Sequence, residues 1–373
     1  MKEGWKKVKL MDNCSVTTGK NDANHAVDNG RYRFYTCASE YLYCNTYKYD
    51  GACIILPGNG ANVGDVYFYE GKFDAYQRTY VIDNISPKVL PFYLYYQLQY
   101  GWKTYGVAKQ YGSATNYIKI GNFKDYEFLC PNIDTQKEIV EYLDSSFAKI
   151  DKLKENAAKN LEEAKALFQS ALKDALEPKE GWEEKTLKEI SIIYGNYGLS
   201  VSSIPYNGVR YLRITDITEN GKLNDDKVSA DISSGKTQEE LQEGDILFAR
   251  TGATVGKTLI YKEEFGKCLF AGYLIRYRLN KDIVIPQYIH HFTHSSDYYK
   301  WVSLSQKTAA QPNIGAKVYN ELRIPIPSLS EQQSIVSFLD SLNEKVNTLQ
   351  QNYSRICNEC DALKQAILRQ VFG

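Results

Sequence analysis

The sequence contains no uninterrupted apolar run of 18 or more residues, so it predicts no membrane-spanning helix. Its first residues, MKEGWKKVKLMDN, contain no apolar stretch of the kind that forms a signal peptide. We therefore expect a cytoplasmic protein. Hydrophobic residues make up 43% of the 373 residues, which is enough for packed cores and too many for a disordered chain. A chain of this length predicts two or more domains.

Charge of one sign is not in excess either, since 45 Lys and Arg balance 45 Asp and Glu. This balance gives no general indication of a polyanionic partner, although a local basic face could still bind DNA. The eight cysteines are scattered, and without a secretion signal we expect reduced thiols. Cys357 and Cys360 form a C-x-x-C, but no second pair lies nearby to complete a zinc site. No metal is therefore expected.

The signatures of several enzyme classes are missing as well. The sequence contains no N-P-P-[FY] or D-P-P-Y loop for amino-methylation and no G-x-G-x-x-G after a predicted strand. It also lacks the G-x-S-x-G of α/β-hydrolases and the H-E-x-x-H of zinc proteases. These absences predict a binding protein that is not itself an enzyme and carries no cofactor.

What the sequence does contain is a tandem duplication. Four segments recur in order. They are KEGW at 2–5 and 179–182, GNGANVG at 58–64 with RTGATVG at 250–256, LPFYL at 90–94 with IPQYI at 285–289, and PNIDTQKEIVEYLDS at 131–145 with PSLSEQQSIVSFLDS at 327–341. The offset grows from 177 residues at KEGW to 196 at the proline, so the second copy has 19 additional residues (196 − 177). Such insertions are expected in loops on a shared scaffold.

Each copy begins with segments typical of β-strands and turns. The expected strands lie within 31–37, 51–58, 63–69 and 78–82 in copy one, and within 209–215, 244–250, 257–263 and 272–279 in copy two. A short helix is expected after each set, at 90–102 and at 285–301. His290 and His294 lie four residues apart on the second of these helices, but without a third ligand we interpret them as ordinary histidines.

Each copy ends in a predicted long helix. Apolar residues within 335–371 recur in steps of four and three, which is typical of a coiled-coil seam, and residues 143–171 show the same rhythm. Asp134 and Ser330 are expected to be the N-caps of these helices. Because helices in globular cores usually have roughly 8–20 residues, we expect these two helices to pair with each other.

The stretch RTGATVGKT at 250–258 ends in Gly-Lys-Thr, as the phosphate loop of an NTPase does. Only three residues separate Gly252 from Gly256, however, whereas the phosphate loop has four. That loop must also open a helix, and the following TLIYKEEFGK is typical of a strand. The first copy has Asp65 in place of the lysine, which does not suit an anion site. The sequence therefore predicts a glycine turn between two strands.

Taken together, these segments resemble the specificity subunit of a type I restriction–modification system. The resemblance is carried by IPIPSLSEQQSIVSFLDSLNEKV, CPNIDTQKEIVEYLDSSFAKI, GDILFARTGATVGKT, KTAAQPNIGAKVYNELRIPIP, RYRFYTCAS and VRYLRITDI. It covers essentially the whole chain. It implies an α+β fold, with two duplicated α/β target-recognition domains joined by two long antiparallel coiled-coil helices. We expect the domains at 1–133 and 180–329 and the spacer helices at 134–179 and 330–373.

The resemblance also implies a function. Each recognition domain would read one half of a split, asymmetric double-stranded DNA site. Methylation (M) subunits, expected to number two and to contact the helices and recognition domains, would use S-adenosylmethionine to modify adenine. Restriction (R) subunits would add cleavage driven by ATP with Mg, and none of these activities would reside on this chain. A helix of about 43 residues rises roughly 65 Å, which spans at most about 19 base pairs.

Candidate DNA contacts follow from their chemistry, since Lys, Arg, Ser and Thr bind phosphates while Arg, Lys, Asn and Gln read base edges. They lie in the glycine turns, in the polar loops before the long helices and, in copy one, among nearby arginines. They are Arg31, Arg33, Asn59, Asn62, Arg78, Lys109, Ser113, Thr115 and Asn116 in copy one, and Arg250, Thr251, Thr254, Lys257, Lys307, Thr308, Gln311 and Asn313 in copy two. The glycines are expected to form the turns themselves.

Three other interpretations stay open on the sequence alone. The first is a coiled-coil adaptor with two peptide- or sugar-binding modules, which salt-dependent DNA binding would exclude. The second is an NTPase, which the absence of ATP turnover would exclude. The third is the DNA-reading subunit of a type II enzyme with a similar split site, which neighbouring genes would distinguish.

Overall fold

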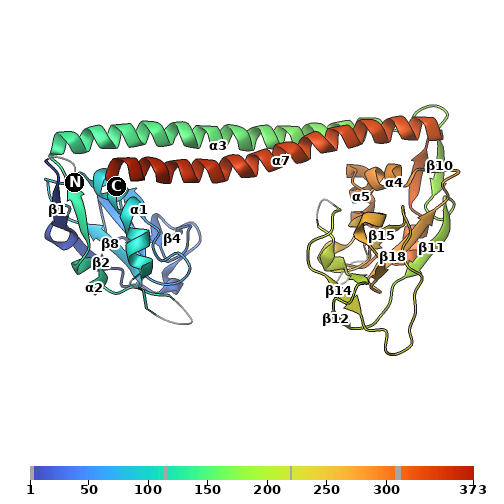
Figure 1. Cartoon of the computed structure of the whole chain (residues 1–373), viewed down its shortest axis with the longest axis horizontal. Helices are drawn as coiled ribbons and strands as arrows, with labels where there is room; N and C mark the ends of the chain where they lie inside the picture. Colours follow the sequence, from blue (N-terminus) through green and yellow to red (C-terminus); the bar gives the residue numbers. More distant parts are fainter. Residues whose placement is uncertain (1–3, 109, 112–115, 219–220, 307–311) are drawn as a thin grey trace. The chain divides into compact units, whose positions relative to one another are not determined.

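The chain forms two compact units in a computed structural model that describes residues 4–108, 110–111, 116–218, 221–306 and 312–373 (Figure 1). Unit 1 comprises Met1–Ala158 and Tyr353–Gly373, and unit 2 comprises Lys159–Asn352. Each unit contains one copy of the duplicated segment and part of each of two long helices, α3 (Ile133–Leu176) and α7 (Leu329–Phe372). The two units are described separately, and the domain limits expected from the sequence stay a prediction.

A four-stranded antiparallel sheet forms the centre of copy one. Its order is β2 (Ser15–Thr18), β8 (Thr79–Asp83), β5 (Ala52–Pro57) and β6 (Tyr67–Glu70). Alternate residues of β5 point to opposite faces of the sheet. Ile54 and Leu56 therefore join a core with Trp102, whereas Cys53 and Ile55 join a second core.

Different elements cover the two faces of this sheet. The core that contains Trp102 lies under α1 (Pro91–Ala108). The second core lies under β3 (Tyr32–Tyr35), β4 (Leu42–Cys44) and β7 (Phe73–Ala75), which form a three-stranded sheet in which β3 and β7 are parallel. A separate pair, β1 (Lys6–Lys9) with β9 (Glu127–Cys130), and the short α2 (Gly121–Lys124) complete the copy. All four strands expected in copy one are confirmed.

Copy two repeats this arrangement. Its sheet has the order β11 (Ser191–Tyr197), β18 (Leu274–Leu279), β15 (Ile246–Ala249) and β16 (Thr258–Ile260). A parallel pair, β13 (Arg210–Leu212) with β17 (Cys268–Phe270), matches β3 with β7, and β10 (Glu183–Thr186) with β19 (Arg323–Ile326) matches β1 with β9. Copy two adds the pair β12 (Ser203–Pro205) and β14 (Val228–Ala230). The four strands expected here are confirmed too.

The helical layer differs between the copies. The single helix expected at 285–301 is instead two helices, α4 (Pro286–Phe292) and α5 (Ser296–Ser305) (Figure 1). The break occurs because Ser295 caps a new helix, its side chain accepting a hydrogen bond from the amide of Tyr298 at 3.2 Å. A third short helix, α6 (Ala316–Asn320), corresponds to α2.

The helices α3 and α7 each run for 44 residues without interruption. Their N-caps are Asn132 and Ser328, whose side chains accept hydrogen bonds from the amides three residues on, at 2.9 and 3.3 Å. The N-caps predicted at Asp134 and Ser330 are wrong, because both residues lie inside the first helical turn. Among the described residues, no helix is sufficiently long and apolar to cross a membrane.

Within unit 1 the two long helices run antiparallel, as expected. Lys154 pairs with Asp361 at 2.9 Å and Asp151 with Lys364 at 2.6 Å, so residue numbers fall along α7 as they rise along α3. The buried Sγ of Cys360 lies 4.0 Å from the carbonyl oxygen of Ile150 on the facing helix.

The predicted seam is buried only in part. Leu143 and Leu339 are fully buried, each in the core of its own copy, whereas Leu153, Leu349 and Leu363 are 52%, 39% and 49% exposed. A straight helix drifts by about 20° per heptad relative to a strict seven-residue repeat, so one stripe does not face the same neighbour throughout. The core of each copy buries the beginning of its long helix, and the apolar residues that do this have the same spacing as those of a coiled coil.

A buried glutamine attaches each long helix to its own domain. In copy one, Gln136 accepts the amide of Leu90 and donates to the carbonyls of Lys88 and Pro131, at 2.8 to 2.9 Å. Gln332 makes the same three bonds in copy two, at 2.8 to 3.0 Å. Both glutamines have no exposed surface. Because these bonds satisfy buried backbone groups, they fix where each helix begins relative to its domain.

Candidate nucleic-acid interface

The glycine turn joins two strands in both copies, as the sequence predicted. It connects β5 to β6 in copy one and β15 to β16 in copy two, so a strand and not a helix follows Lys257. Gly60 and Gly252 have φ values of 85° and 67°, in the left-handed region that favours glycine. At Gly256 a Cβ would lie 2.8 Å from a methyl group of Val302 on α5, so a side chain there would clash.

In copy one this turn is hydrogen-bonded to the polar loop that precedes α2. The amide of Gly60 donates to the carbonyl of Asn116 at 2.8 Å, and the amide of Ile118 donates to the carbonyl of Gly58 at 2.9 Å. Asn59 and Tyr117 form the bridge between them. The glycine turn and Asn116, which are more than fifty positions apart, therefore lie side by side.

Copy two repeats these bonds at the equivalent positions. The amide of Gly252 donates to the carbonyl of Pro312 at 3.0 Å, and the amide of Ile314 donates to the carbonyl of Arg250 at 2.9 Å. Thr251 and Asn313 form the bridge. We call this feature the turn–loop site: residues 58–65 with 116–118 in copy one, and 250–257 with 312–314 in copy two.

In copy two the turn–loop site presents an arginine. Nε of Arg250 donates to Oδ1 of Asn313 at 3.4 Å, and the guanidinium carbon lies 4.9 Å from the centroid of the Tyr197 ring. Thr254 is turned inward, since its hydroxyl donates to the carbonyl of Thr251 at 3.0 Å and so stabilises the turn. Lys257 is half-buried and directly precedes β16.

In copy one the same site contains a small cavity. Asn59, Arg78 and Tyr117 are among the residues that line a space of about 190 Å³, and Arg78 is exposed. The side chain of Asn62 donates to the carbonyl of Cys37 at 2.8 Å, so it ties the turn to the segment after β3. The exposed Asn116 contributes its carbonyl to the turn, as described above.

The remaining arginines predicted in copy one contact tyrosines. Nη1 of Arg33 donates to the hydroxyl of Tyr35 at 3.2 Å, and its guanidinium lies 4.2 Å from the ring centroid of Tyr41 and 4.5 Å from that of Tyr69. Arg31 is exposed. The described contacts of Arg33 are thus with aromatic side chains of its own domain.

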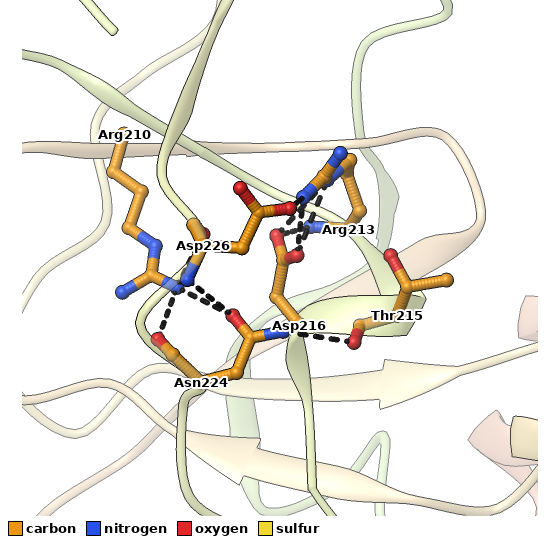
Figure 2. A network of polar contacts seen from close by, with 6 residues as sticks. All are labelled: Arg210, Arg213, Thr215, Asp216, Asn224 and Asp226. Carbon is orange, nitrogen blue, oxygen red and sulfur yellow. Dashed lines mark hydrogen bonds and ion pairs between the residues drawn. The ribbon is translucent and has the colours of Figure 1, made fainter. Parts of the chain in front are cut away.

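The counterpart of Arg33 in copy two is Arg210, because both residues occupy the first position of the parallel strand pair. Figure 2 shows that Arg210 is held by polar groups instead of rings. Its Nη2 donates to the carbonyl and side-chain oxygens of Asn224, at 2.8 and 3.1 Å, and to the carbonyl of Asp226 at 3.0 Å. Only 5% of Arg210 is exposed.

A second arginine completes this network. Arg213 contacts the carboxylates of Asp216 and Asp226, both at 2.7 Å (Figure 2). The hydrogen bond to Asp216 raises the pKa of the Arg213 guanidinium, which outweighs the opposite effect of burial. The network holds the loop that follows β13. Sequence reasoning missed it because the partners lie on a loop up to 16 residues away, where no periodic pattern indicates contact.

Six of the predicted residues lie outside the described part of the chain, and they are Lys109, Ser113, Thr115, Lys307, Thr308 and Gln311. Nothing in the geometry tests the roles assigned to the other eleven, which stay predictions. What the structure adds is their grouping: Asn59 and Asn116 come together in copy one, and Arg250, Thr251 and Asn313 come together in copy two.

The histidines of copy two pack against neighbouring residues and form no candidate metal site with the described residues. In the described residues, His, Cys, Asp and Glu form no group of three or more that could hold a metal ion. His290 and His294 both point their Nε2 atoms at Gly221, where a Cβ would lie 3.1 and 3.0 Å from them. Both histidine rings therefore pack against the backbone at Gly221.

Comparison with known proteins agrees with this architecture. A sequence model described as the type I restriction modification DNA specificity domain matches residues 2–163 and 179–356, one match to each copy. The chain is similar to the type I restriction enzyme EcoDI specificity subunit of Escherichia coli, with 25% identity over 406 residues that cover 99% of this chain and 88% of that protein.

Two solved structures share the fold. A chain of the structure described as "Structural basis underlying complex assembly and conformational transition of the type I R-M system" aligns with a TM-score of 0.75 and 17% identity, covering 99% of this chain and 97% of that one. The HsdS subunit from Thermoanaerobacter tengcongensis aligns with a TM-score of 0.56 and 16% identity, covering 100% and 97%. The predicted fold of two modules with two long helices is confirmed. Because the family match includes both copies, the chain belongs to the type I restriction–modification DNA specificity family.

Proposed function

We propose that this chain reads a bipartite, asymmetric double-stranded DNA site, with one half of the site read by each copy. One observation carries this proposal. The backbone bonds of the turn–loop site recur one for one in the two copies, whereas the side chains on it differ. Gly58, Asn59 and Tyr117 stand in copy one where Arg250, Thr251 and Asn313 stand in copy two. A shared scaffold with different hydrogen-bonding groups suits the reading of different base pairs.

The contacts divide by chemistry. Backbone amides and hydroxyl and lysine side chains of the turns suit phosphate oxygens, which position a protein on the duplex without reading sequence. Arginine and asparagine side chains suit base edges. Arg250 in copy two, and Asn59 and Arg78 in copy one, are therefore the residues that we assign to base reading, and Asn313 orients Arg250 through its side-chain oxygen.

The chemistry itself belongs to partner subunits. On this proposal two methylation (M) subunits contact the long helices and the recognition domains and modify adenine in each half-site with S-adenosylmethionine. Restriction (R) subunits use ATP and Mg to translocate and cleave DNA. The support for this division is that relatives of the chain are named specificity subunits of type I restriction enzymes. The chain itself would contribute no catalytic group.

Sequencing of methylated bases in the host tests this function most directly. Genomes with and without an intact gene for this chain are compared. Deletion of the gene is expected to abolish adenine methylation at one motif made of two short defined parts separated by a fixed unread gap. Methylation that is unchanged in the deletion strain would exclude the proposal.

Binding by the purified complex with its methylation subunits supplies an independent test. Fluorescence anisotropy on a duplex that contains the motif should show affinity that falls steeply with salt, because phosphate contacts release counterions. Affinity that does not depend on salt would favour the adaptor interpretation with peptide- or sugar-binding modules instead.

A further inference from the structure

We propose that Arg250 reads a guanine in the half-site of copy two, and that copy one makes no equivalent contact. This inference rests on the proposed function, because it assumes that the turn–loop site faces DNA. It adds the kind of base that one half-site must contain and names the side chain that selects it.

The first argument is that the Arg250 guanidinium is held in one orientation. The ring of Tyr197 lies against the guanidinium at 4.9 Å, and Asn313 accepts a hydrogen bond from Nε at 3.4 Å. Tyr197 is itself held in place, since its hydroxyl accepts the amide of Ala316 at the start of α6 at 2.8 Å. Two elements far apart in the sequence therefore orient this side chain before any ligand arrives.

The second argument concerns the guanidinium N–H groups of Arg250 that do not bond to Asn313. Because Nε is directed to Asn313, the edge formed by Nη1 and Nη2 is the part available to a ligand, and the described residues provide no hydrogen-bond partner for it. A planar fork of two parallel N–H groups matches O6 and N7 of guanine in the major groove. Arg250 is half-buried and Tyr197 is 42% exposed, so the pair lies at the surface where a duplex could approach.

The third argument is the contrast with copy one. The equivalent residue is Gly58, where a Cβ would lie 2.2 Å from the carbonyl oxygen of Arg78 and 2.9 Å from the ring of Tyr80. Copy one therefore cannot accept any side chain at this position without moving its backbone. Arg78 occupies the position in copy one that Tyr273 occupies in copy two, because the carbonyl of each accepts the amide of the equivalent turn residue, Gly58 or Arg250. Arg78 therefore reaches the site from a different segment of the chain than Arg250 does.

A phosphate contact is the competing role for Arg250. Phosphate binding requires positive charge near the backbone and does not require a fixed guanidinium plane, so lysine would serve nearly as well. The stacking on Tyr197 together with the bond to Asn313 fixes that plane. Pre-organisation of this kind favours bidentate recognition of a base edge over a charge contact.

Selection and binding experiments on the whole complex test the inference. The complex with its methylation subunits selects its site from a double-stranded library of random sequence. Affinities for duplexes with each base pair of that site changed singly are then measured by fluorescence anisotropy. The variants are R250A, R250K, Y197A and N313A, and R323A is the control because it removes an exposed arginine elsewhere in copy two. Thermal unfolding of each variant complex verifies folding.

The expected result is confined to one base pair. Replacing one guanine in a single half-site should weaken binding by the wild-type complex by about 5- to 150-fold. R250A should lose affinity to a similar extent and should no longer distinguish that guanine from other bases. R250K should retain the salt dependence of binding with reduced discrimination, Y197A and N313A should fall between R250A and wild type, and R323A should match wild type.

Three outcomes would overturn the inference or the proposal beneath it. If R250A binds all duplexes more weakly by the same factor, Arg250 contacts a phosphate and the inference is wrong. If R250A and R250K keep the wild-type preference at every position, Arg250 reads nothing. If the wild-type complex selects no sequence at all, the proposed function fails, and this result is distinct from the first two.

Discussion

The two copies attach their domains to the long helices at the same position with different chemistry. In copy one the hydroxyl of Tyr96 on α1 donates to Oδ1 of Asp144 on α3. In copy two His291 on α4 lies 2.8 Å from Oδ1 of Asp340 on α7. Both copies therefore contain this contact to a helix aspartate, but a tyrosine forms it in copy one and a histidine forms it in copy two.

This difference extends beyond one residue. His290, His291 and His294 of copy two stand where copy one has Tyr95, Tyr96 and Gln99. Burial is the main cause that lowers the pKa of all three histidines, most strongly that of His290. Burial instead raises the pKa of Tyr96, so its hydroxyl stays protonated near neutral pH. The two copies should thus respond differently to acid.

The largest effect is expected from shortening both helices together. Deleting residues 152–158 of α3 and 357–363 of α7, which face each other in the antiparallel pairing of unit 1, removes two turns from each helix. Seven helical residues rise about 10.5 Å, so the unread gap of the DNA site should shrink by about three base pairs. Methylation of the wild-type motif should be lost.

Site selection by the shortened complex measures that gap directly. Both half-sites should keep their sequences, because neither recognition domain is altered. A deletion in α3 alone is the control, since it breaks the pairing without shortening both helices. An unchanged gap in the double deletion would contradict the role of the helices as a spacer.

The next largest effect concerns the glutamine that both copies share. Q332A leaves a buried amide and two carbonyls without partners and should reduce the free energy of unfolding by about 3 kcal/mol. Q136A should have a similar effect in copy one. The neighbouring Q333A is the control, because Gln333 is exposed. Chemical denaturation provides the energies, and a loss limited to one copy would show that the two attachments are not equivalent.

Lowering the pH should reduce the stability of the two copies to different extents. A histidine whose pKa is lowered by folding binds protons better in the unfolded state. The stability that these histidines contribute is therefore fully present above the unfolded value of about 6.5 and decreases as pH falls from there toward the folded pKa. Asp340 opposes this for His291, whereas Lys262 reinforces it for His290. Unit 2 should lose stability in this range before unit 1 does.

Hydrogen exchange measured at pH 7.5 and pH 5.5 reports the local stability of each unit separately. Protection factors, which correct each amide for its slower intrinsic exchange at low pH, should fall at pH 5.5 in α4 and in the first turns of α7, with little change in α1. The variant H290Y/H291Y/H294Q, which carries the residues of copy one, should reduce this difference. An equal loss of protection in both units would show that the histidines do not cause it.

The smallest effect is expected at the helix pair. Unit 1 has the ion pair between Asp151 and Lys364, whereas the equivalent positions in unit 2 are Asn347 and Phe168. The partners are 59% and 24% exposed, so D151N should reduce stability by less than about 1 kcal/mol. The reduction should diminish at high salt. Denaturation at low and high salt measures both, and a loss above this range would mean that the pair is more important than its exposure suggests.

Local sequence patterns predicted most of the secondary structure. The strands around both glycine turns and the extent of α3 and α7 follow from residue periodicity, which local backbone geometry imposes. The N-caps were misplaced by two residues, because Asp and Ser near a helix start are favourable at several positions and only the backbone decides among them. The seam was overestimated, because burial by a domain and burial by a second helix select the same apolar spacing.

The candidate site was predicted only as separate parts. Arg250 and Asn313 were both singled out by residue type, but nothing local indicates that a turn and a loop 63 residues apart share a bridge. Tyr197, which orients Arg250, was missed because it lies in a strand where tyrosine is common. Long-range pairing of this kind leaves no periodic signal in a single sequence.

The sequence by itself determined that the chain is a duplication with two long helices and that its glycine turn is not a phosphate loop. These conclusions depend on repetition, spacing and local conformation, which can be recognised from the order of residues alone. The tertiary structure alone decided which side chains meet: the glutamines that attach the helices, the histidines that pack together in copy two, and the tyrosine and asparagine that orient Arg250. Those contacts depend on how sheets and helices pack, and packing joins residues that the sequence keeps apart.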